Sequence, residues 1–155
     1  LNDDLSDITL AIVGPDDGHR STLEAIVERR ELGDNVLSMG AVYGDAKLTA
    51  YSDADVFVLP SKDRYESFGN VVVEAMACRT AVVMTNCCGV SEWVGDAGVV
   101  VSPEVKRLSA AISNLLRDKE RRARLAEAGY EQVKALQWSA IAERMDDVYT
   151  NIGRV

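Results

Sequence analysis

The chain has 155 residues, of which 25 are acidic and 17 basic, so its formal net charge is −8. With 47% hydrophobic and 27% charged residues, it lies in the ordinary globular range and is long enough to bury a substantial core, so we expect one compact domain over residues 1–155. The acidic balance and the lack of a Lys/Arg-rich run argue against binding to nucleic acid, which requires a cationic surface.

The first part of the sequence predicts three strands and two helices. Residues 8–14 form a short apolar run rich in β-branched residues that ends in Gly-Pro-Asp-Asp-Gly, a pattern typical of a buried strand before a turn. A helix is expected next, because Ser21 and Glu24 have the spacing of a capping box and apolar residues then recur with helical period as far as Leu32. The remaining elements expected here are a strand at Val36–Met39 closing at Gly40, a helix at Ala46–Ser52, and a strand at Val56–Leu59 stopped by Pro60.

The second part predicts two further strands and a helical end. Residues 61–69 are polar and irregular, and Asn70–Cys78 is expected to be a helix, although its three consecutive valines would also suit a strand. Strands are expected at Ala81–Thr85 and Gly98–Val101, and the period becomes helical from Glu104 onward. Strands that alternate with helices predict an α/β protein with a Rossmann-like open parallel sheet that is covered by helices on both faces.

Two features predict a cytoplasmic protein. No apolar run approaches the ~18 residues of a membrane-spanning helix, and the acidic N-terminus LNDDLSD is unlike a signal peptide.

Cys78, Cys87 and Cys88 cannot all pair, and no His or Cys lies at metal-ligand spacing from the adjacent pair, so free thiols are expected. The lone histidine, His19, is expected in an exposed loop without a catalytic role.

The loop after the third expected strand carries the main candidate site. Ligands of an open parallel sheet collect beyond the carboxyl ends of the strands, where helix N-termini direct their first amides. Glu66 and Glu74 bracket the start of the expected helix at Asn70, which places Glu74 about 6 Å along the helix axis. Both carboxylates would then reach one cleft, with the amides near residues 68–70 between them. This arrangement suits a ligand with a central phosphate and hydroxylated rings at both ends, which is the outline of a sugar nucleotide.

A simpler interpretation of the two glutamates stays open. Glu66 would be a solvated loop carboxylate, and Glu74 a helix-surface residue favoured near the positive end of the dipole. The neighbours of Glu74 weigh against this, because residues 71–77 are apolar apart from it and a buried carboxylate is costly unless hydrogen-bonded. Cys87 and Cys88 suggest thiol chemistry as a further alternative, but no basic residue adjoins them in the sequence, so inert packing is expected.

Two glutamates stand eight residues apart in a longer motif, Glu66-Ser-Phe-Gly-x4-Glu74-Ala-Met-Ala, which is followed by Ala81-Val-Val-Met-Thr. This motif resembles the Glu-x7-Glu signature of the group 1 glycosyltransferases, a family of retaining enzymes with the two-domain GT-B fold. Three flanking segments resemble family segments in the same order: Ile12-Val-Gly14, residues 54–61, and Gly89-x-x-Glu92. The chain thus resembles the C-terminal, donor-binding domain of such an enzyme from about Ile8 to Tyr149.

The resemblance implies roles for particular residues. Glu66 would hold hydroxyls of the donor sugar at the catalytic centre, and Glu74 would hold the ribose diol. The other donor-binding residues implied are Phe68 and Gly69 for the sugar, Asn70 and Val71 for the diphosphate, Gly40, Ala41 and Val42 for the base, and Gly14 and Gly89 in the adjoining loops. These transferases typically work without a metal ion, so no metal or cofactor is expected besides the nucleoside diphosphate sugar, from which a hexose would pass to an acceptor.

The chain departs from the family pattern in two places. The family usually carries Gly-Gly where this chain has Cys88-Gly89, and the added Cβ at position 88 is expected to hinder a close backbone approach. The family's donor domain also opens with a strand carrying Gly-Arg and a nearby Lys, and neither precedes Asp7. Because that strand is normally central, the sheet is expected to be rearranged or completed by a neighbouring chain.

The missing segments favour a piece of a longer transferase. The chain begins with Leu1 rather than Met and lacks the family's N-terminal acceptor domain, so we expect it to bind a nucleotide sugar weakly and to transfer it poorly by itself. The alternatives are a stand-alone nucleotide-sugar-binding subunit or scaffold, and another GT-B-like enzyme such as an epimerase or a phosphorylase. A phosphorylase would need a lysine that binds pyridoxal phosphate, and the only lysine near the signature is Lys62, which is expected to face solvent. The expected partners are the missing domain or a partner chain, and the apolar stripe with Trp138 and Ile141 in the last helix predicts self-association.

Overall fold

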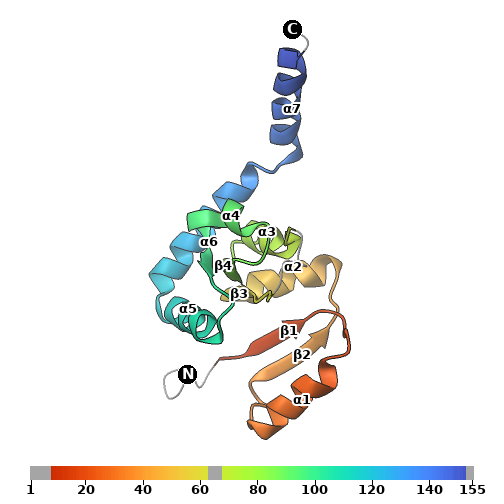
Figure 1. The fold of residues 1–155 in the computed structure, drawn as a ribbon, viewed down its shortest axis with the longest axis vertical. Helices are drawn as coiled ribbons and strands as arrows, with labels where there is room; N and C mark the ends of the chain where they lie inside the picture. The colour runs from red at the N-terminus through yellow and green to blue at the C-terminus, as the bar shows by residue number, and fades with distance from the viewer. Residues whose placement is uncertain (1–7, 63–67, 153–155) are drawn as a thin grey trace. The chain divides into compact units, whose positions relative to one another are not determined.

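The computed structural model describes residues 8–62 and 68–152. The chain divides into two compact units, Leu1–Lys47 and Leu48–Val155, called here the N-terminal and C-terminal units. Each unit holds parallel strands with helices against them (Figure 1). All five expected strands and every expected helical region are present, so the predicted α/β fold class is confirmed. The assignment of the whole chain to one domain stays a prediction.

The N-terminal unit pairs two parallel strands beside one helix. Its elements are β1 (Leu10–Val13), α1 (Arg20–Arg29) and β2 (Val36–Gly40), followed by the start of α2 (Gly44–Asp53). The register of the two strands shifts between Ile12 and Val13. Beyond the shift, the Gly14 amide donates to the Gly40 carbonyl at 2.9 Å, so the carboxyl ends of both strands lie together.

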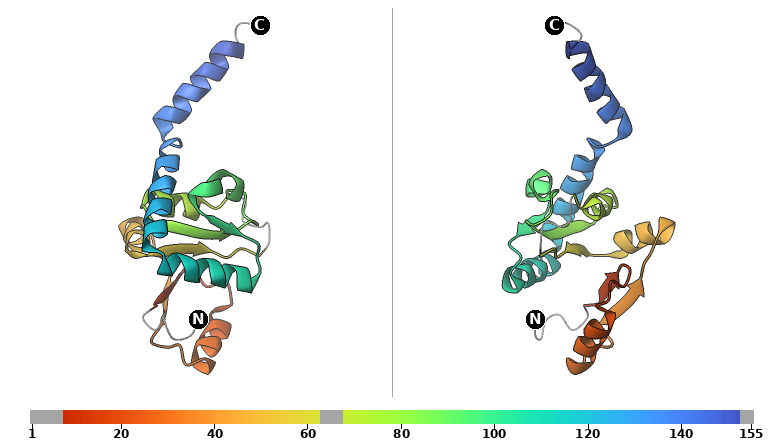
Figure 2. Two further views of the ribbon diagram at one scale, coloured as in Figure 1. Left: turned by 90° about the vertical axis from the view of Figure 1, so that its left-hand side faces the viewer. Right: turned by 45° about the vertical axis from the view of Figure 1, so that its right-hand side comes forward.

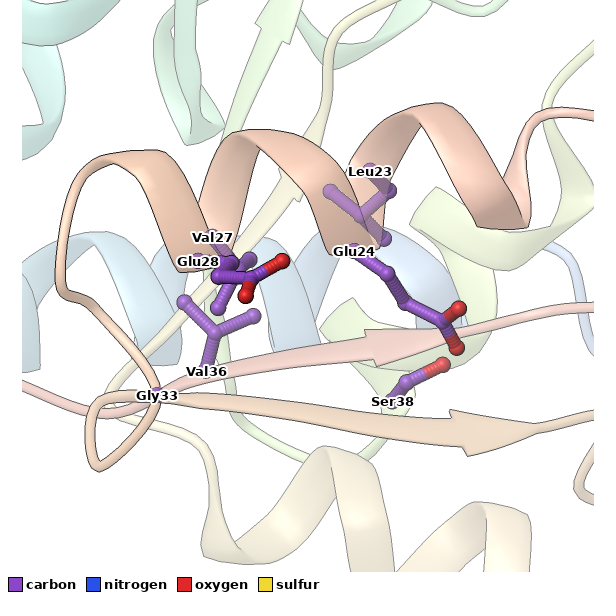
Figure 3. Close-up of a pocket in the computed structure, with 7 residues that line it drawn as sticks. All are labelled: Leu23, Glu24, Val27, Glu28, Gly33, Val36 and Ser38. Atoms are coloured by element: carbon purple, nitrogen blue, oxygen red, sulfur yellow. The ribbon is translucent and has the colours of Figure 1, made fainter.

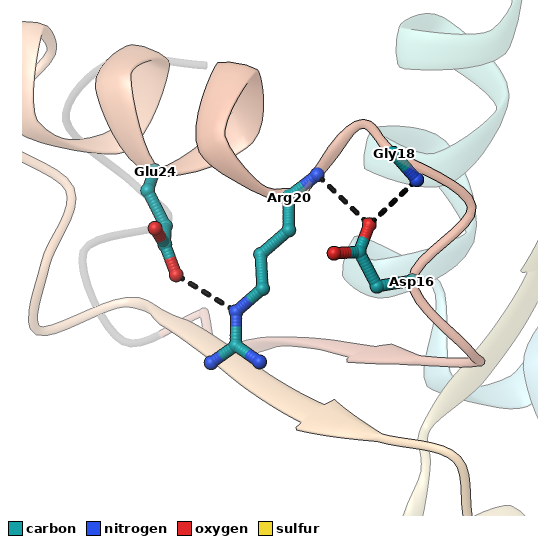
Figure 4. Close-up of polar contacts among 4 residues, drawn as sticks. All are labelled: Asp16, Gly18, Arg20 and Glu24. Atoms are coloured by element: carbon teal, nitrogen blue, oxygen red, sulfur yellow. Dashed lines mark hydrogen bonds and ion pairs between the residues drawn. The ribbon is translucent and has the colours of Figure 1, made fainter.

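The start of α1 differs from the expected capping box. The helix begins at Arg20, and the residue before it, His19, makes no side-chain cap. Figure 4 shows Asp16 in that role: its Oδ1 accepts the amides of Gly18 at 2.8 Å and Arg20 at 3.2 Å. These amides hold the pKa of the Asp16 carboxyl below its ordinary value. The cap expected at Ser21 was therefore wrong, because a carboxylate reaches the first turn from the preceding loop, and Glu24 pairs instead with Arg20 Nε at 2.9 Å.

The C-terminal unit is a three-stranded parallel sheet between two layers of helices. The strands are β3 (Val56–Leu59), β4 (Ala81–Thr85) and β5 (Val99–Val101), in the order β3-β4-β5. The helices are α3 (Asn70–Ala77), α4 (Ser91–Val94), the 3-10 helix η1 (Gly95–Ala97), α5 (Val105–Arg117), α6 (Lys119–Lys134) and α7 (Trp138–Ile152). The short α4 was not expected, since the sequence around Gly89 and Glu92 was interpreted as a loop.

The central strand β4 is buried along its whole length. Successive side chains of a strand point to opposite faces, so Val82 and Met84 pack among residues of α3 and α4. Ala81 and Val83 pack on the other face, against α5 and α6. Figure 2 shows the teal helix α5 and the green helices α3 and α4 on opposite faces of this sheet. Burial on both faces explains why β4 is a continuous apolar run rather than an alternating one.

Gly98 lies where the sheet has no room for a side chain. A Cβ at this position would meet Val82 Cγ2 and Val94 Cγ1 at 2.7 Å each. Both valines are 1% exposed, so neither can move aside into solvent. We expect Gly98→Ala to lower the free energy of unfolding by about 1–3 kcal/mol, through overpacking. Urea unfolding followed by tryptophan fluorescence measures this, since both tryptophans, Trp93 and Trp138, lie in the C-terminal unit.

The matched control for Gly98 removes the clash from the other side. Val82→Ala deletes one of the two methyl groups that the new Cβ would meet, so Gly98→Ala is expected to cost less in that background. Equal costs in the two backgrounds would contradict the steric explanation.

The helix α6 packs against helices of both layers, α3 on one side and α5 on the other. Gly129 allows the approach on one side, since a Cβ there would lie 3.2 Å from the side chain of the buried Met76. On the other side Arg122 Nη1 donates to the carbonyls of Leu115 at 3.1 Å and Leu116 at 2.8 Å, which satisfies the end of α5. Arg122 Nη2 also donates to Asp55 Oδ1 at 3.0 Å. These contacts fix the turn that precedes β3.

The last helix, α7, has an uncovered apolar stripe, as expected. None of its residues is buried, and Trp138 is 86% exposed. In Figure 1 α7 extends away from the other helices of its unit. Self-association through this stripe stays a prediction. Among the described residues, no helix combines the length and the apolar character needed to cross a membrane.

Candidate functional site

The N-terminus of α3 is built on a left-handed glycine. Gly69 has φ 92° and ψ 50° and precedes the first helical residue, Asn70. Its carbonyl accepts the Val72 amide at 2.9 Å, which begins the helix. The three consecutive valines are thus helical rather than extended. Their β-branched side chains are tolerated because this short helix buries Val72 completely in the core.

A backbone hydrogen bond joins this helix start to the loop after β4. The Val90 amide donates to the Phe68 carbonyl at 2.8 Å. A Cβ on the buried Gly69 would lie 3.1 Å from Val90 Cγ1, so glycine permits this close approach. The structure therefore brings together Phe68 and Gly69, two of the residues expected to bind the donor, with the segment that contains Gly89.

The loop after β3 is held at the same edge of the sheet. Thr85, which is 1% exposed at the end of β4, donates its hydroxyl to the Ser61 carbonyl at 2.6 Å. The Cys87 thiol donates to the Lys62 carbonyl at 3.4 Å. The carboxyl ends of β3 and β4 and the start of α3 therefore form one connected surface. Glu66 belongs to the same loop but lies outside the described residues, so its expected role stays a prediction.

Glu74 lies on the second turn of α3, as the sequence predicted. Its side chain is half-buried, and its Oε2 accepts a hydrogen bond from the Tyr51 hydroxyl at 2.9 Å. The interpretation of Glu74 as a plain surface glutamate is therefore wrong. Tyr51 was not among the residues expected at the site, although it lies in the helix expected before β3. Only the spacing of tyrosine on that helix was available as a signal, and spacing does not reveal a partner on another helix.

The residues expected to line the base, Gly40, Ala41 and Val42, lie in the N-terminal unit, together with Gly14 of an adjoining loop. Gly14 follows β1 and Gly40 ends β2, and the hydrogen bond between their backbones joins them. Ala41 and Val42 follow directly in the turn before α2. Gly40 has φ 67°, in the left-handed region that favours glycine. These residues form a group of their own at the carboxyl ends of the two strands.

The two adjacent cysteines differ in their surroundings. The Cys88 side chain is 2% exposed and belongs to the core cluster that contains Met76 and Met84. Its Cβ therefore points into the core, so the expected hindrance at position 88 does not arise on the outer side of the loop, where Gly89 is exposed. All three cysteines are free thiols, as predicted.

A hollow of about 450 Å³ lies elsewhere, between α1 and β2 in the N-terminal unit. Figure 3 shows its walls: Leu23, Glu24, Val27 and Glu28 from α1, Val36 and Ser38 from β2, and Gly33. The charged residues among these are Glu24, which is paired with Arg20, and Glu28. It contains none of the residues expected to bind the donor. His19 is exposed at the start of α1, as expected.

Metal-ligating side chains do not gather in the part of the chain that the structure describes. Within residues 8–62 and 68–152, no group of three or more His, Cys, Asp or Glu side chains is placed to hold a metal ion. What the described site offers is a helix N-terminus, a carboxylate fixed by a tyrosine, and glycine turns that allow close approach to the backbone. This combination suits an anionic ligand that also carries hydroxyl groups.

Comparisons with known proteins all identify glycosyltransferases as similar to this chain. The sequence model of the family described as glycosyl transferases group 1 matches residues 1–132. The chain is 34% identical over 125 residues to O-antigen chain mannosyltransferase B of Escherichia coli, covering 80% of this chain and 32% of that protein. The chain therefore spans about a third of the length of this relative.

Solved structures share the fold. A sucrose-phosphate synthase of Thermosynechococcus elongatus is similar with a TM-score of 0.77 and 33% identity, covering 94% of this chain and 39% of that one. Anabaena HepE, solved in complex with UDP-glucose, is similar with a TM-score of 0.78 and 20% identity, covering 94% of this chain and 42% of that one.

Proposed function

Since the chain belongs to the family of group 1 glycosyl transferases, we propose that it is the donor-binding half of a retaining glycosyltransferase. In this proposal the chain is the C-terminal half of a GT-B enzyme, and it binds a nucleoside diphosphate sugar whose hexose passes to an acceptor. The acceptor would be held by a separate domain, which is consistent with the 32% of the Escherichia coli relative that this chain covers.

The observation that carries the proposal is the start of α3. The first amides of a helix have no partners within the helix, and together with the helix dipole they attract a phosphate group. Gly69 brings this helix start against the loop after β4, and Glu74 follows on the next turn with its carboxylate held by Tyr51. Anion-binding amides thus lie one turn from an acceptor of hydroxyl hydrogen bonds. The UDP-glucose bound to the structural neighbour HepE has both kinds of group.

Each site residue has a role in this proposal. The amides of Asn70 and Val71 hold the diphosphate, and the helix dipole stabilises the leaving nucleoside diphosphate in place of a metal ion. Glu74 accepts hydrogen bonds from the ribose diol, and Glu66 accepts them from the donor sugar. The backbone at Phe68 and Gly69 faces the sugar, Gly40, Ala41 and Val42 line the base, and Gly14 and Gly89 lie in the adjoining loops. The proposal includes no cofactor, and its cytoplasmic location rests on the free thiols.

A thermal-shift panel tests the proposal. UDP, GDP, ADP and their common sugars are added to the complete product of the gene, with the matching nucleosides as controls that lack the diphosphate. A ligand at 100 times its dissociation constant stabilises a protein by about 2.7 kcal/mol, which raises its melting temperature. We expect one base to give such a shift as the diphosphate and not as the nucleoside. A panel in which no diphosphate shifts the melting temperature would refute the proposal.

A further inference from the structure

Tyr51 is a buried residue of α2 that is fixed on several sides. It is 8% exposed, and its ring packs edge-to-face on Phe57 of β3, with ring centroids 5.4 Å apart and planes at 80°. Its backbone is fixed as well, because the buried Thr80 hydroxyl donates to the Tyr51 carbonyl at 2.6 Å. Neither the ring nor the backbone therefore has room to shift, and the position of the hydroxyl is determined.

The fixed hydroxyl is directed at one carboxylate oxygen. Tyr51 Oη lies 2.9 Å from Glu74 Oε2, with the phenol as donor and the carboxylate as acceptor. Hydrogen bonds to an ionised group are roughly twice as strong as neutral ones. A glutamate side chain has several rotatable bonds, and ordering it costs up to about 2 kcal/mol of conformational entropy. A donor that is already in place lowers that cost before any ligand arrives.

The Tyr51 hydroxyl stays protonated at neutral and moderately alkaline pH. Burial raises the pKa of Tyr51 well above its ordinary value, and the hydrogen bond to Glu74 raises it further. The phenol therefore remains a donor at neutral and moderately alkaline pH.

Packing alone does not explain this tyrosine. A phenylalanine would fill the same space against Phe57, since the two side chains differ only in the hydroxyl. The acceptor of that hydroxyl is a side chain on the second turn of the proposed anion-binding helix, not a backbone carbonyl inside the core. The hydroxyl therefore acts on the orientation of Glu74.

We propose that Tyr51 is a positioning residue of the donor site, whose hydroxyl fixes the Glu74 carboxylate in the orientation that accepts the ribose hydroxyls of a nucleoside diphosphate. The inference rests on the proposed function and deepens it. Tyr51 itself touches no ligand in this scheme and acts only through Glu74.

Three variants test the inference: Tyr51→Phe, Glu74→Ala and the double variant. Affinity for the nucleoside diphosphate selected by the panel is measured by titration calorimetry on the complete gene product. We expect Tyr51→Phe to weaken binding roughly tenfold, the equivalent of one charge-assisted hydrogen bond. In the Glu74→Ala background the same substitution should weaken binding no further, because the group through which Tyr51 acts is gone.

A second tyrosine provides the matched control. Tyr130 on α6 lies under the Arg79 guanidinium, 3.8 Å from the ring centroid. Tyr130→Phe makes the same chemical change in the same unit, and we expect unchanged nucleotide affinity. Thermal unfolding of each variant without ligand verifies that it is folded.

The outcomes separate the inference from the function on which it rests. If Glu74→Ala weakens binding and Tyr51→Phe does not, or if Tyr51→Phe costs the same in both backgrounds, the positioning role is overturned while the donor site stands. If Glu74→Ala leaves nucleotide affinity unchanged, the proposed donor site falls, and the role of Tyr51 falls with it.

Discussion

Substituting Gly69 with alanine is expected to destabilise the C-terminal unit by about 2–5 kcal/mol and to weaken nucleotide binding at α3. The backbone at Gly69 has φ 92°, a conformation that costs a residue with a Cβ about 1–3 kcal/mol. The new Cβ would also lie 3.1 Å from Val90 Cγ1 and 3.5 Å from Leu59 Cδ2. Val90 is completely buried, so relief of this contact requires a shift of the backbone that joins the two loops.

Gly18 is the control for the backbone part of this effect. It has the same φ of 92°, and nothing lies within 4 Å of a Cβ built on it. Gly18→Ala is therefore expected to cost only the conformational strain, about 1–3 kcal/mol. Urea unfolding followed by far-UV circular dichroism detects the helices of both units. If the two variants lose equal stability, the close packing of Gly69 against Val90 is not significant.

Replacing Glu74 with alanine is expected to weaken the binding of a nucleoside diphosphate roughly 10- to 100-fold, because hydrogen bonds to a charged group contribute ~1.5–3 kcal/mol. The loss should be equal for the diphosphate and for the sugar-bearing donor, since both carry the ribose. Glu66→Ala is expected to behave differently. It should leave the bare diphosphate unaffected and weaken only the donor that carries the sugar. Calorimetric titration of both ligands against both variants checks this division, and equal effects of Glu66→Ala on both ligands would contradict it.

A more conservative variant separates the binding role of Glu74 from its structural one. Alanine leaves the buried Tyr51 hydroxyl without this acceptor, which costs some stability. Glu74→Gln keeps a side-chain oxygen that can accept from Tyr51 and removes only the charge. We expect Gln to retain near-normal stability and to bind the diphosphate with an affinity between those of the wild type and the alanine variant. If stability falls equally in both variants, the carboxylate charge is needed for folding rather than for the ligand.

The sequence was sufficient to locate the strands and helices, because each is encoded by local patterns. The short β-branched runs at β3 and β4 were predicted with the bounds that the structure gives. Their apolar character follows from burial on both faces of a parallel sheet. This need for apolar side chains is the same whichever helices cover the two faces. Asn70 was likewise predicted as the start of α3, since Gly69 and the polar loop before it interrupt the apolar pattern.

Features that depend on the direction in which a loop residue points were not predictable in this way. Asp16 caps α1 from the preceding loop, although Ser21 and Glu24 have the spacing of a capping box. Cys88 appeared to obstruct a glycine turn, but its Cβ points into the core. In both cases residue type alone does not give this direction: the local backbone of the loop places the Asp16 carboxylate within reach of the amides of Gly18 and Arg20, whereas packing in the core places Cys88.

The sequence by itself determined the α/β class, the order of the elements, and the helix start that Glu66 and Glu74 bracket. These follow from periodicity, from turn residues and from spacing along one chain. Only the tertiary structure decided that Glu74 is held by Tyr51, which is 23 residues away on another helix, and that Phe68 bonds to the loop of Val90. Such contacts form when helices and loops pack on the two faces of one sheet, and side-chain packing in three dimensions leaves no periodic trace in the sequence.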